Sequence, residues 1–122
     1  MPLDTGLIDW VGEAMAPLGT VTHRRMMGGA TLYLDGPEDA KTVFAIVDAD
    51  GSLWFKGDAA TDAAWDAAGC ARFTYERSDG TVASMNYRRA PEDCLDDPDA
   101  LREWAALGVE AGRRAPVRKR AK

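Results

Sequence analysis

The residue types that most often carry catalysis are scarce in this sequence and poorly placed for it. Its 122 residues include one histidine, His23, and two cysteines, Cys70 and Cys94. His23 precedes two arginines, and neighbouring positive charge disfavours a protonated imidazole. Each cysteine lies beside a glycine or a leucine, a setting typical of small buried residues rather than nucleophiles. We therefore expect no catalytic residue in the chain.

Metal and phosphate sites are also poorly supported. One histidine and two separated cysteines are too few ligands for zinc. The DADG segment at 48–51 lacks the further oxygen ligands of a calcium loop. The acidic residues between 92 and 99 are expected to interact favourably with the positive N-terminal end of a following helix rather than to bind metal. Gly28 and Gly29 lack the other glycines and the helix of a phosphate loop. We expect no metal and no cofactor.

Arg24 and Arg25 open the most unusual segment, RRMMGGATLYLDG. Its alternation predicts a β-hairpin whose two-residue turn is Gly28 and Gly29, since adjacent glycines supply positive φ angles. The two arginines then lie on opposite faces of one strand. At least one should point toward the core side or a groove. There it would form either an internal ion pair with a carboxylate or a contact to a ligand or partner.

Methionine and tyrosine side chains form a second group of candidates. Methionine adapts to irregular surfaces and is frequent at recognition sites, but it also fills cores. Core filling is the interpretation that we favour, and a recognition surface is the alternative. The group comprises Met26, Met27, Met85 and Tyr87.

The charge is divided along the chain. Residues 1–112 carry 20 acidic and 9 basic residues, a net charge of −11, whereas residues 113–122 carry 6 basic residues and none that are acidic. This charge density, with Pro116, predicts a disordered basic tail over 113–122. The tail is either a weak arm for nucleic acid or an acidic partner, or a solubilising end. Its basic residues are Arg113, Arg114, Arg118, Lys119, Arg120 and Lys122.

Length and composition predict one domain. A chain of 122 residues with 46% hydrophobic content can bury a core of its own. No apolar run approaches the roughly 20 residues that span a bilayer, and the start has no basic-then-apolar signal. The cysteine spacing fits a reduced compartment. We therefore expect a cytoplasmic protein without a membrane partner.

The first two helices are predicted from apolar spacing. A stripe of apolar residues at helical spacing predicts a helix over 5–18, with Asp4 as its cap. An alanine-rich segment predicts a second helix over 58–68, capped by Asp58 and ended by Gly69. Trp65 is the only large side chain of this second helix, so we expect it to anchor the helix to the core.

The last helix is predicted after the APEDCLDDPDAL segment. Asp97 suits the N-cap and Pro98 the first helical position, where the missing N–H would have had no partner. Gly108 and Gly112 lie within this helix. They indicate either close approach by another element, including one from a second subunit, or fraying toward the tail.

Two further hairpins complete the expected fold. Strands at 42–48 and 52–56 join at an Asp-Gly turn, and strands at 72–77 and 81–87 join at another. The predicted order is αββββαββα. Because glycine-bearing turns join the strands pairwise, we expect a two-layer α+β fold with a mostly antiparallel sheet of about six strands and helices on one face.

Three segments, RRMMGGATLYLDG, VFAIVDADGSLWFK and ASMNYRRAPEDCLDDPDAL, resemble in order and spacing the N-terminal domain of the TfoX/Sxy family, which is named for bacterial regulators of competence for DNA uptake. The resemblance runs from Ile8 to Ala111. Met27 stands where phenylalanine is usual, and Thr31 where glycine is common. The resemblance implies a two-layer α+β domain over residues 1–112. The family's better-known regulators carry a second, helical domain that does not fit into this chain, so we expect the domain to stand alone.

The resemblance also implies a function. A stand-alone domain of this family is expected to act through protein–protein contacts, in transcriptional regulation, and as a homodimer. The expected mechanism is steric recruitment of a partner by a sheet edge or strand face. The alternatives are weak nucleic-acid binding through the basic tail, or small-molecule binding in a pocket between sheet and helices. The candidate interaction residues are Arg24, Arg25, Met26, Gly28, Gly29, Tyr33 and Tyr87.

Overall fold

The computed structural model describes residues 5–26, 28–35 and 41–114. In chain order they form α1 (Thr5–Met15), β1 (Val21–Met26), β2 (Gly29–Asp35), β3 (Lys41–Val47), β4 (Leu53–Lys56), α2 (Asp62–Ala67), β5 (Arg72–Glu76), β6 (Val82–Arg89), the 3₁₀ helix η2 (Glu92–Leu95) and α3 (Pro98–Arg114). The strands make one six-stranded sheet in the order β1-β2-β3-β4-β6-β5, and every neighbouring pair is antiparallel. The predicted α+β fold and element order are confirmed.

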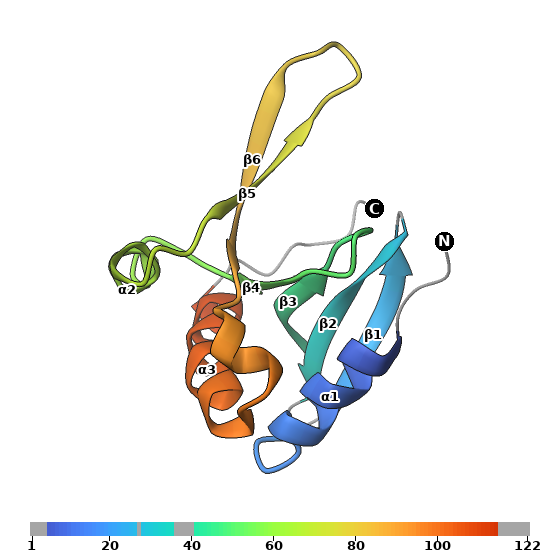
Figure 1. Cartoon of the computed structure of the whole chain (residues 1–122), viewed down its shortest axis with the longest axis vertical. Coiled ribbons are helices and arrows are strands. Elements are labelled where there is room, and N and C mark those ends of the chain that lie inside the picture. Colours follow the sequence, from blue (N-terminus) through green and yellow to red (C-terminus); the bar gives the residue numbers. More distant parts are fainter. Residues whose placement is uncertain (1–4, 27, 36–40, 115–122) are drawn as a thin grey trace, which may run out of the picture.

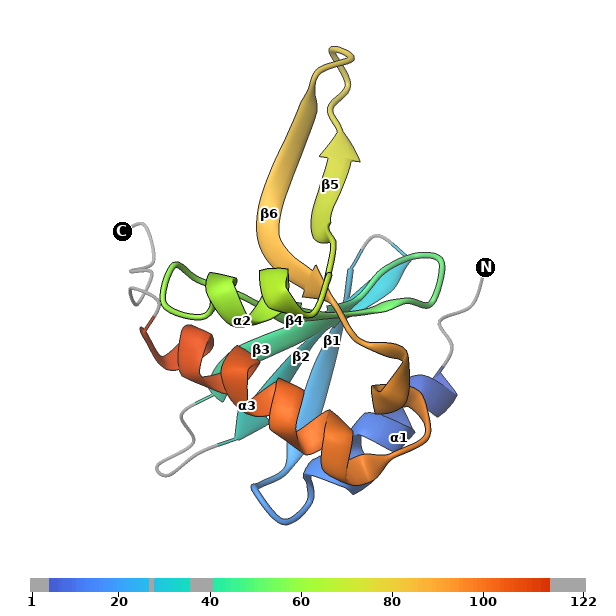
Figure 2. The ribbon, with the colours of Figure 1, turned by 60° about the vertical axis from the view of Figure 1, so that its left-hand side comes forward.

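The helices lie on one side of the sheet (Figure 1). α1 and α3 contact each other and pack across the strands, and α2 lies beside them near the start of the β5–β6 hairpin (Figure 2). The hairpin itself projects away from the rest of the molecule. We call the side of the sheet under the helices the covered face and the opposite side the open face.

The main core lies between the covered face and the helices. Side chains alternate along each strand, so β2 sends Ala30, Leu32 and Leu34 into this layer. Trp65 of α2 is fully buried and stacks on Phe55 of β4 and Trp104 of α3, with ring centroids 5.9 and 4.9 Å apart. The predicted anchoring role of Trp65 is therefore confirmed.

Gly108 and Gly112 let α3 lie directly on β3. A Cβ at Gly108 would sit 2.6 Å from the Phe44 carbonyl oxygen, and one at Gly112 would sit 2.1 Å from that of Val43. Close approach by another element is thus the correct interpretation, and the element is β3 of the same chain. Fraying is wrong, because α3 continues through Arg114.

The first hairpin differs from the prediction at Gly29. Met26 of β1 pairs with Gly29 of β2, so Gly29 belongs to the strand. Gly28 supplies the positive φ of the turn, at +84°. Gly29 is required for a different reason, because a Cβ there would lie 2.0 Å from the Val47 carbonyl oxygen of β3.

Two helix boundaries also differ from the prediction. α1 ends at Met15, whose carbonyl accepts hydrogen bonds from the N–H groups of Leu18 and Gly19 at 2.8 and 3.1 Å. α2 begins at Asp62 with Thr61 as its N-cap, because residues 58–61 form a separate turn. Gly69, with φ +73°, follows α2 as predicted.

The start of α3 agrees with the prediction. The Asp97 carboxylate accepts a hydrogen bond from the N–H of Asp99 at 2.9 Å, and Pro98 is the first helical residue. The short helix η2 before it was not predicted. Predictions for Asp4, Met27 and the residues after Arg114 concern positions outside the described ranges. Within those ranges, no helix is both long and apolar enough to cross a membrane.

Candidate interaction surface

A small apolar cluster lies on the open face, separate from the main core. Ile46 of β3, Trp54 of β4 and Tyr87 of β6 are 3, 9 and 7% exposed, and Val43 and Phe73 pack against them. Trp54 and Phe73 meet edge to face, with centroids 5.0 Å apart and an interplanar angle of 82°. We call these five residues the floor. No helix among the described residues covers them.

Two cations lie over the aromatic rings of the floor. The Lys56 ammonium is 5.2 Å from the Tyr87 ring centroid, and the Arg89 guanidinium carbon is 5.5 Å from the Trp54 ring. Cation–π contacts of this kind are worth about 0.5–1 kcal/mol at exposed sites. Neither cation joins an ion pair with another described residue. Burial raises the pKa of Tyr87, and the nearby Tyr33 phenol adds to the shift.

The orientation of Trp54 is fixed by Asp48. The Trp54 indole N–H donates to one carboxylate oxygen of Asp48 at 2.8 Å. The other oxygen accepts from the N–H groups of Asp50 and Ser52, both at 2.9 Å, and so closes the β3–β4 turn. Gly51 follows with φ +86°. The DADG segment therefore forms a hairpin turn that aligns a floor side chain.

The β5–β6 hairpin, which we call the arm, continues the open face beyond the body. Its register separates an apolar side from a polar side. Tyr75 and Met85 on the apolar side are 41 and 38% exposed, and Val82, 73% exposed, is the apolar exception on the polar side. The apolar side carries Phe73, Tyr75, Ala83 and Met85, and the polar side carries Thr74 and Ser84.

The tip of the arm is a tight turn, as the sequence predicts. Gly80 has φ +88°, and its N–H donates to the Arg77 carbonyl at 2.9 Å. The Asp79 carboxylate accepts from both the N–H and the hydroxyl of Thr81 at 3.0 and 2.6 Å. These bonds fix the register of the two strands and hence which side chains share the apolar side.

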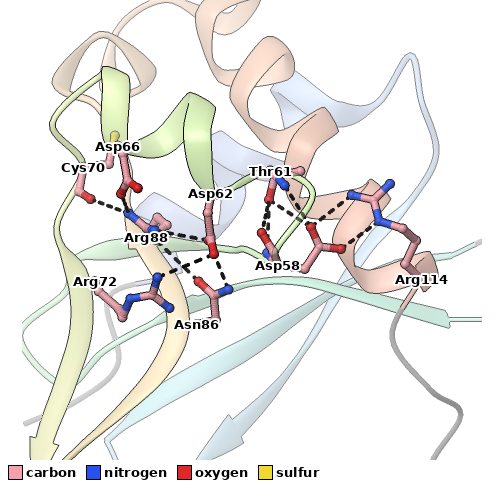
Figure 3. Close-up of polar contacts among 9 residues, drawn as sticks. All are labelled: Asp58, Thr61, Asp62, Asp66, Cys70, Arg72, Asn86, Arg88 and Arg114. Carbon is pink, nitrogen blue, oxygen red and sulfur yellow. Dashed lines mark hydrogen bonds and ion pairs between the residues drawn. The ribbon is translucent and has the colours of Figure 1, made fainter.

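The base of the arm is held to α2 by a buried arginine (Figure 3). Arg88 is 2% exposed on the covered face. Its guanidinium donates to Asp66 at 2.7 Å, to Asp62 at 3.1 Å and to the Cys70 carbonyl at 3.1 Å. Asn86 donates to the same Asp62 oxygen at 3.2 Å. The network thus fixes the direction in which the arm leaves the body.

A second polar cluster joins the start of α2 to the end of α3 (Figure 3). The Arg114 guanidinium donates to the two carboxylate oxygens of Asp58 at 2.7 and 3.1 Å. The Asp58 carboxylate also accepts from the N–H and the hydroxyl of Thr61, both at 3.1 Å. The hydrogen bonds from Arg114, and then those from Thr61, outweigh burial and lower the pKa of Asp58 from 3.8 to about 2.

The predicted arginine pair lies on β1, at one edge of the sheet. Arg24 and Arg25 are both exposed, and neither forms an ion pair with another described residue. An internal ion pair for this pair is therefore wrong, because an edge strand leaves both of its faces near water. Arg24 lies across from Thr31 on the open face, which it shares with Tyr33. Arg25 and His23 lie on the opposite face.

The methionine and tyrosine candidates divide between two environments. Tyr87 is buried in the floor, whereas Met85 is exposed on the arm, so core filling holds for Tyr87 and not for Met85. Met26 is the last residue of β1, far from both in the sheet order. Tyr33 is half-buried on β2. The structure therefore brings Tyr33 and Tyr87 to one face and leaves Gly28 and Gly29 with backbone roles.

The described part of the predicted tail belongs to α3. Arg113 and Arg114 form the last turn of that helix, where positive charge complements the helix dipole. Arg114 is engaged by Asp58 and by Glu110, whose carboxylate is 3.6 Å away. Arg118, Lys119, Arg120 and Lys122 lie outside the described ranges. Of the two described tail cations, Arg113 is the one without an ion-pair partner in the described residues.

The two cysteines are buried thiols. Cys94 is fully buried, and desolvation, with smaller contributions from nearby groups, raises its pKa to about 12. Burial also raises the pKa of Cys70, although the Arg88 charge opposes the shift. Thiols of this kind are poor nucleophiles at neutral pH. Across the part of the chain that the structure describes, no three His, Cys, Asp or Glu side chains are grouped to hold a metal ion.

Sequence reasoning missed the residues that define the open face. Trp54, Phe73, Tyr75 and Arg89 were not among the candidates, and neither was Arg88 of the covered face. One signal was present: β5 and β6 alternate apolar and polar residues, which predicts that one side of their hairpin is buried. Arg88 falls on the covered side of that alternation, where an arginine requires carboxylate partners.

The fold and the open face define a two-layer α+β domain with an arm. The family model of the TfoX N-terminal domain matches residues 13–112. The chain therefore belongs to the TfoX N-terminal domain family, which is linked to competence regulators, as the sequence resemblance implied. A search of the curated proteins finds no match.

Proposed function

We propose that this protein is a non-catalytic interaction domain that binds a protein through its open face, in cytoplasmic regulation of the kind its family is named for. The observation that carries the proposal is the continuity of the floor with the arm. Ile46, Trp54 and Tyr87 of the floor are buried, but the apolar side of the arm that continues from them leaves Tyr75 and Met85 41 and 38% exposed. Exposed apolar surfaces of this kind mark interaction sites.

The composition of the surface favours a protein partner. Aromatic residues, methionine and arginine are enriched at protein interfaces, and Trp54, Tyr75, Met85 and Arg89 all belong to the open face. Nucleic acid is less favoured, because the body carries 20 acidic and 9 basic residues and Arg114 of the predicted tail is engaged by Asp58. The raised thiol pKa values support a non-catalytic role.

Photo-cross-linking tests this proposal with an internal control. p-Benzoylphenylalanine replaces Tyr75 on the apolar side of the arm, or Thr74, its exposed neighbour on the polar side. On irradiation of cells that produce the full chain, we expect protein adducts from position 75 and few or none from position 74. Equal labelling from the two positions, or none from either, would overturn the proposal.

A further inference from the structure

We propose that the occupant of the open face is the arm of a second copy of this chain. In the proposed dimer, two copies are related by a two-fold axis, and each lays the apolar side of its arm on the floor of the other. The inference rests on the proposed function, since it names the partner for the same surface. It requires that the arm, and the cations Lys56 and Arg89 that lie over the buried rings of the floor, remain accessible in each copy.

The arm needs a covering layer to be stable. A two-stranded hairpin alone in water is marginally stable at best. Beyond its base, this arm has no described element against Tyr75 or Met85, which are 41 and 38% exposed. The opposite side of the same strands is mostly polar. This alternation is typical of strands with one buried face, so the structure shows a hairpin patterned for a layer that the single copy does not supply.

A second copy satisfies this need reciprocally. Each chain carries one arm and one floor, so a two-fold axis pairs each arm with the floor of the other copy and leaves neither arm uncovered. Tyr87 of β6 belongs to the floor, and Val82 at the tip end of β6 is five residues away, which corresponds to about 17 Å at about 3.3 Å per residue. An axis through the middle of the arm, near Met85, would place each tip over the floor of the other copy.

Charge supports the same pairing. The cations Lys56 and Arg89 lie over the floor rings without a carboxylate partner in the described residues. Asp48, at the edge of the floor, already accepts three hydrogen bonds. The tip carries two carboxylates, Glu76 and Asp79, around the single cation Arg77. In the proposed dimer, the more acidic tip approaches the more basic floor, whereas a phosphate backbone on this face would meet the same two carboxylates.

The first experiment measures the solution mass of the full chain of 13.2 kDa by light scattering. Met85→Asp places a charge on the apolar side of the arm, and Ser84→Asp places the same charge on the adjacent residue of the polar side. We expect a dimer for the native chain and for Ser84→Asp, and at least a tenfold weaker dimer for Met85→Asp. Tyr75→Asp and Thr74→Asp repeat the comparison on β5, in case one variant fails to fold.

The second experiment identifies which surfaces of the two copies are in contact. The chain with p-benzoylphenylalanine at position 75 is mixed with a ¹⁵N-labelled native chain, irradiated and digested. We expect cross-links that join the unlabelled arm to labelled peptides containing residues 43–54 of the other copy. A dimer with cross-links elsewhere, or one that Met85→Asp leaves intact, would overturn the arm-on-floor arrangement.

The two proposals fail in distinguishable ways. A native chain that remains monomeric overturns the dimer. If position 75 then still cross-links a different protein in cells while position 74 does not, the open face remains an interaction surface and the proposed function stands. If position 75 yields no adduct either, both proposals fall.

Discussion

The two faces of the sheet differ in what their side chains contact, although neighbouring residues of the same strands supply both. Phe55 is fully buried on the covered face, whereas Trp54, one residue earlier, lies on the open face with a cation over its ring. Arg88 is buried among carboxylates, whereas Arg89, one residue later, is exposed. Consecutive residues of a strand point to opposite faces, so one short strand can stabilise the fold on one side and recognise a partner on the other.

The comparison predicts different consequences for substitutions on the two faces. On the covered face, a lost side chain removes packing within one chain, so the cost should be independent of protein concentration. On the open face, the cost should appear mainly in association and therefore depend on concentration. Pairs of matched substitutions can test this division.

The largest effect is expected for Trp65→Ala on the covered face. Trp65 is fully buried against two aromatic rings, so truncation should lower the free energy of unfolding by about 3–5 kcal/mol. For the proposed dimer, Tyr75→Ala on the arm should shift the urea midpoint chiefly at the higher protein concentrations, where association contributes to stability. Urea denaturation followed by circular dichroism at several concentrations distinguishes the two.

Trp65→Phe refines this prediction. The Trp65 indole N–H has no hydrogen-bond partner among the described residues. An unsatisfied buried donor costs about 1–3 kcal/mol, and phenylalanine removes it while keeping an aromatic ring. We expect Trp65→Phe to cost much less than Trp65→Ala. Equal losses for the two would contradict the account of this core position.

The next effect compares two adjacent arginines. Arg88→Met leaves Asp62 and Asp66 without their cation and should cost about 2–3 kcal/mol, reduced from the value for a fully buried pair because Asp66 is 68% exposed. Arg89→Met should cost less than about 1 kcal/mol, the value of its cation–π contact. Urea denaturation measures both. A similar loss of unfolding free energy for both variants would mean that the covered and open faces contribute alike to stability, against the proposed division of roles.

The sequence predicted the helices, strands and turns more accurately than it predicted which residues form the open face. Turn residues and alternation are local signals, and they placed the Asp79-Gly80 turn and the N-cap at Asp97 correctly. At the first hairpin, Gly29 was predicted in the turn but belongs to β2, because nothing in the sequence distinguishes the roles of Gly28 and Gly29. Gly29 is required because a Cβ there would clash with the Val47 carbonyl of β3, a contact that is visible only in the folded structure.

The open face depends on which strands become neighbours. The sequence gives no signal that β4 pairs with β6, which brings Trp54 beside Arg89 and Lys56 beside Tyr87. Because Arg24 and Arg25 are adjacent, at least one was predicted to point toward the core side or a groove. Their strand lies at the edge of the sheet, and both are exposed. Long-range strand order, rather than local composition, thus decides which residues form the candidate surface.

A smaller effect tests how closely the covered face is packed. Gly112→Ala should force α3 away from the Val43 carbonyl, 2.1 Å from the new Cβ, and cost about 1–2 kcal/mol after the gain in helix propensity. Gly12→Ala in α1 is the matched control, because the nearest atom would be 4.0 Å from its Cβ. That variant should be stabilised by up to about 1 kcal/mol. Thermal melts compare the two, and stabilisation of both would contradict the close approach of α3.

The smallest effect concerns the ion pair between Asp58 and Arg114. Because the native fold lowers the pKa of Asp58 from 3.8 to about 2, its charged form stabilises the fold above pH 3.8, and this contribution is lost as the pH falls toward 2. Arg114→Ala should cost little at pH 7, since Arg114 is 44% exposed and solvent screens the pair. Urea denaturation should show the difference from the native chain shrinking between pH 4 and pH 2.

Arg113→Ala provides the control for this ion pair. Arg113 occupies the same helical turn but pairs with no described residue, so its removal should have little effect at any of these pH values. A difference for Arg114→Ala that persists unchanged at pH 2 would mean that its side chain stabilises the end of α3 by packing instead. Since Asp58 lies on the covered side near α2, neither variant should change the mass of the dimer that we propose to form through the open face.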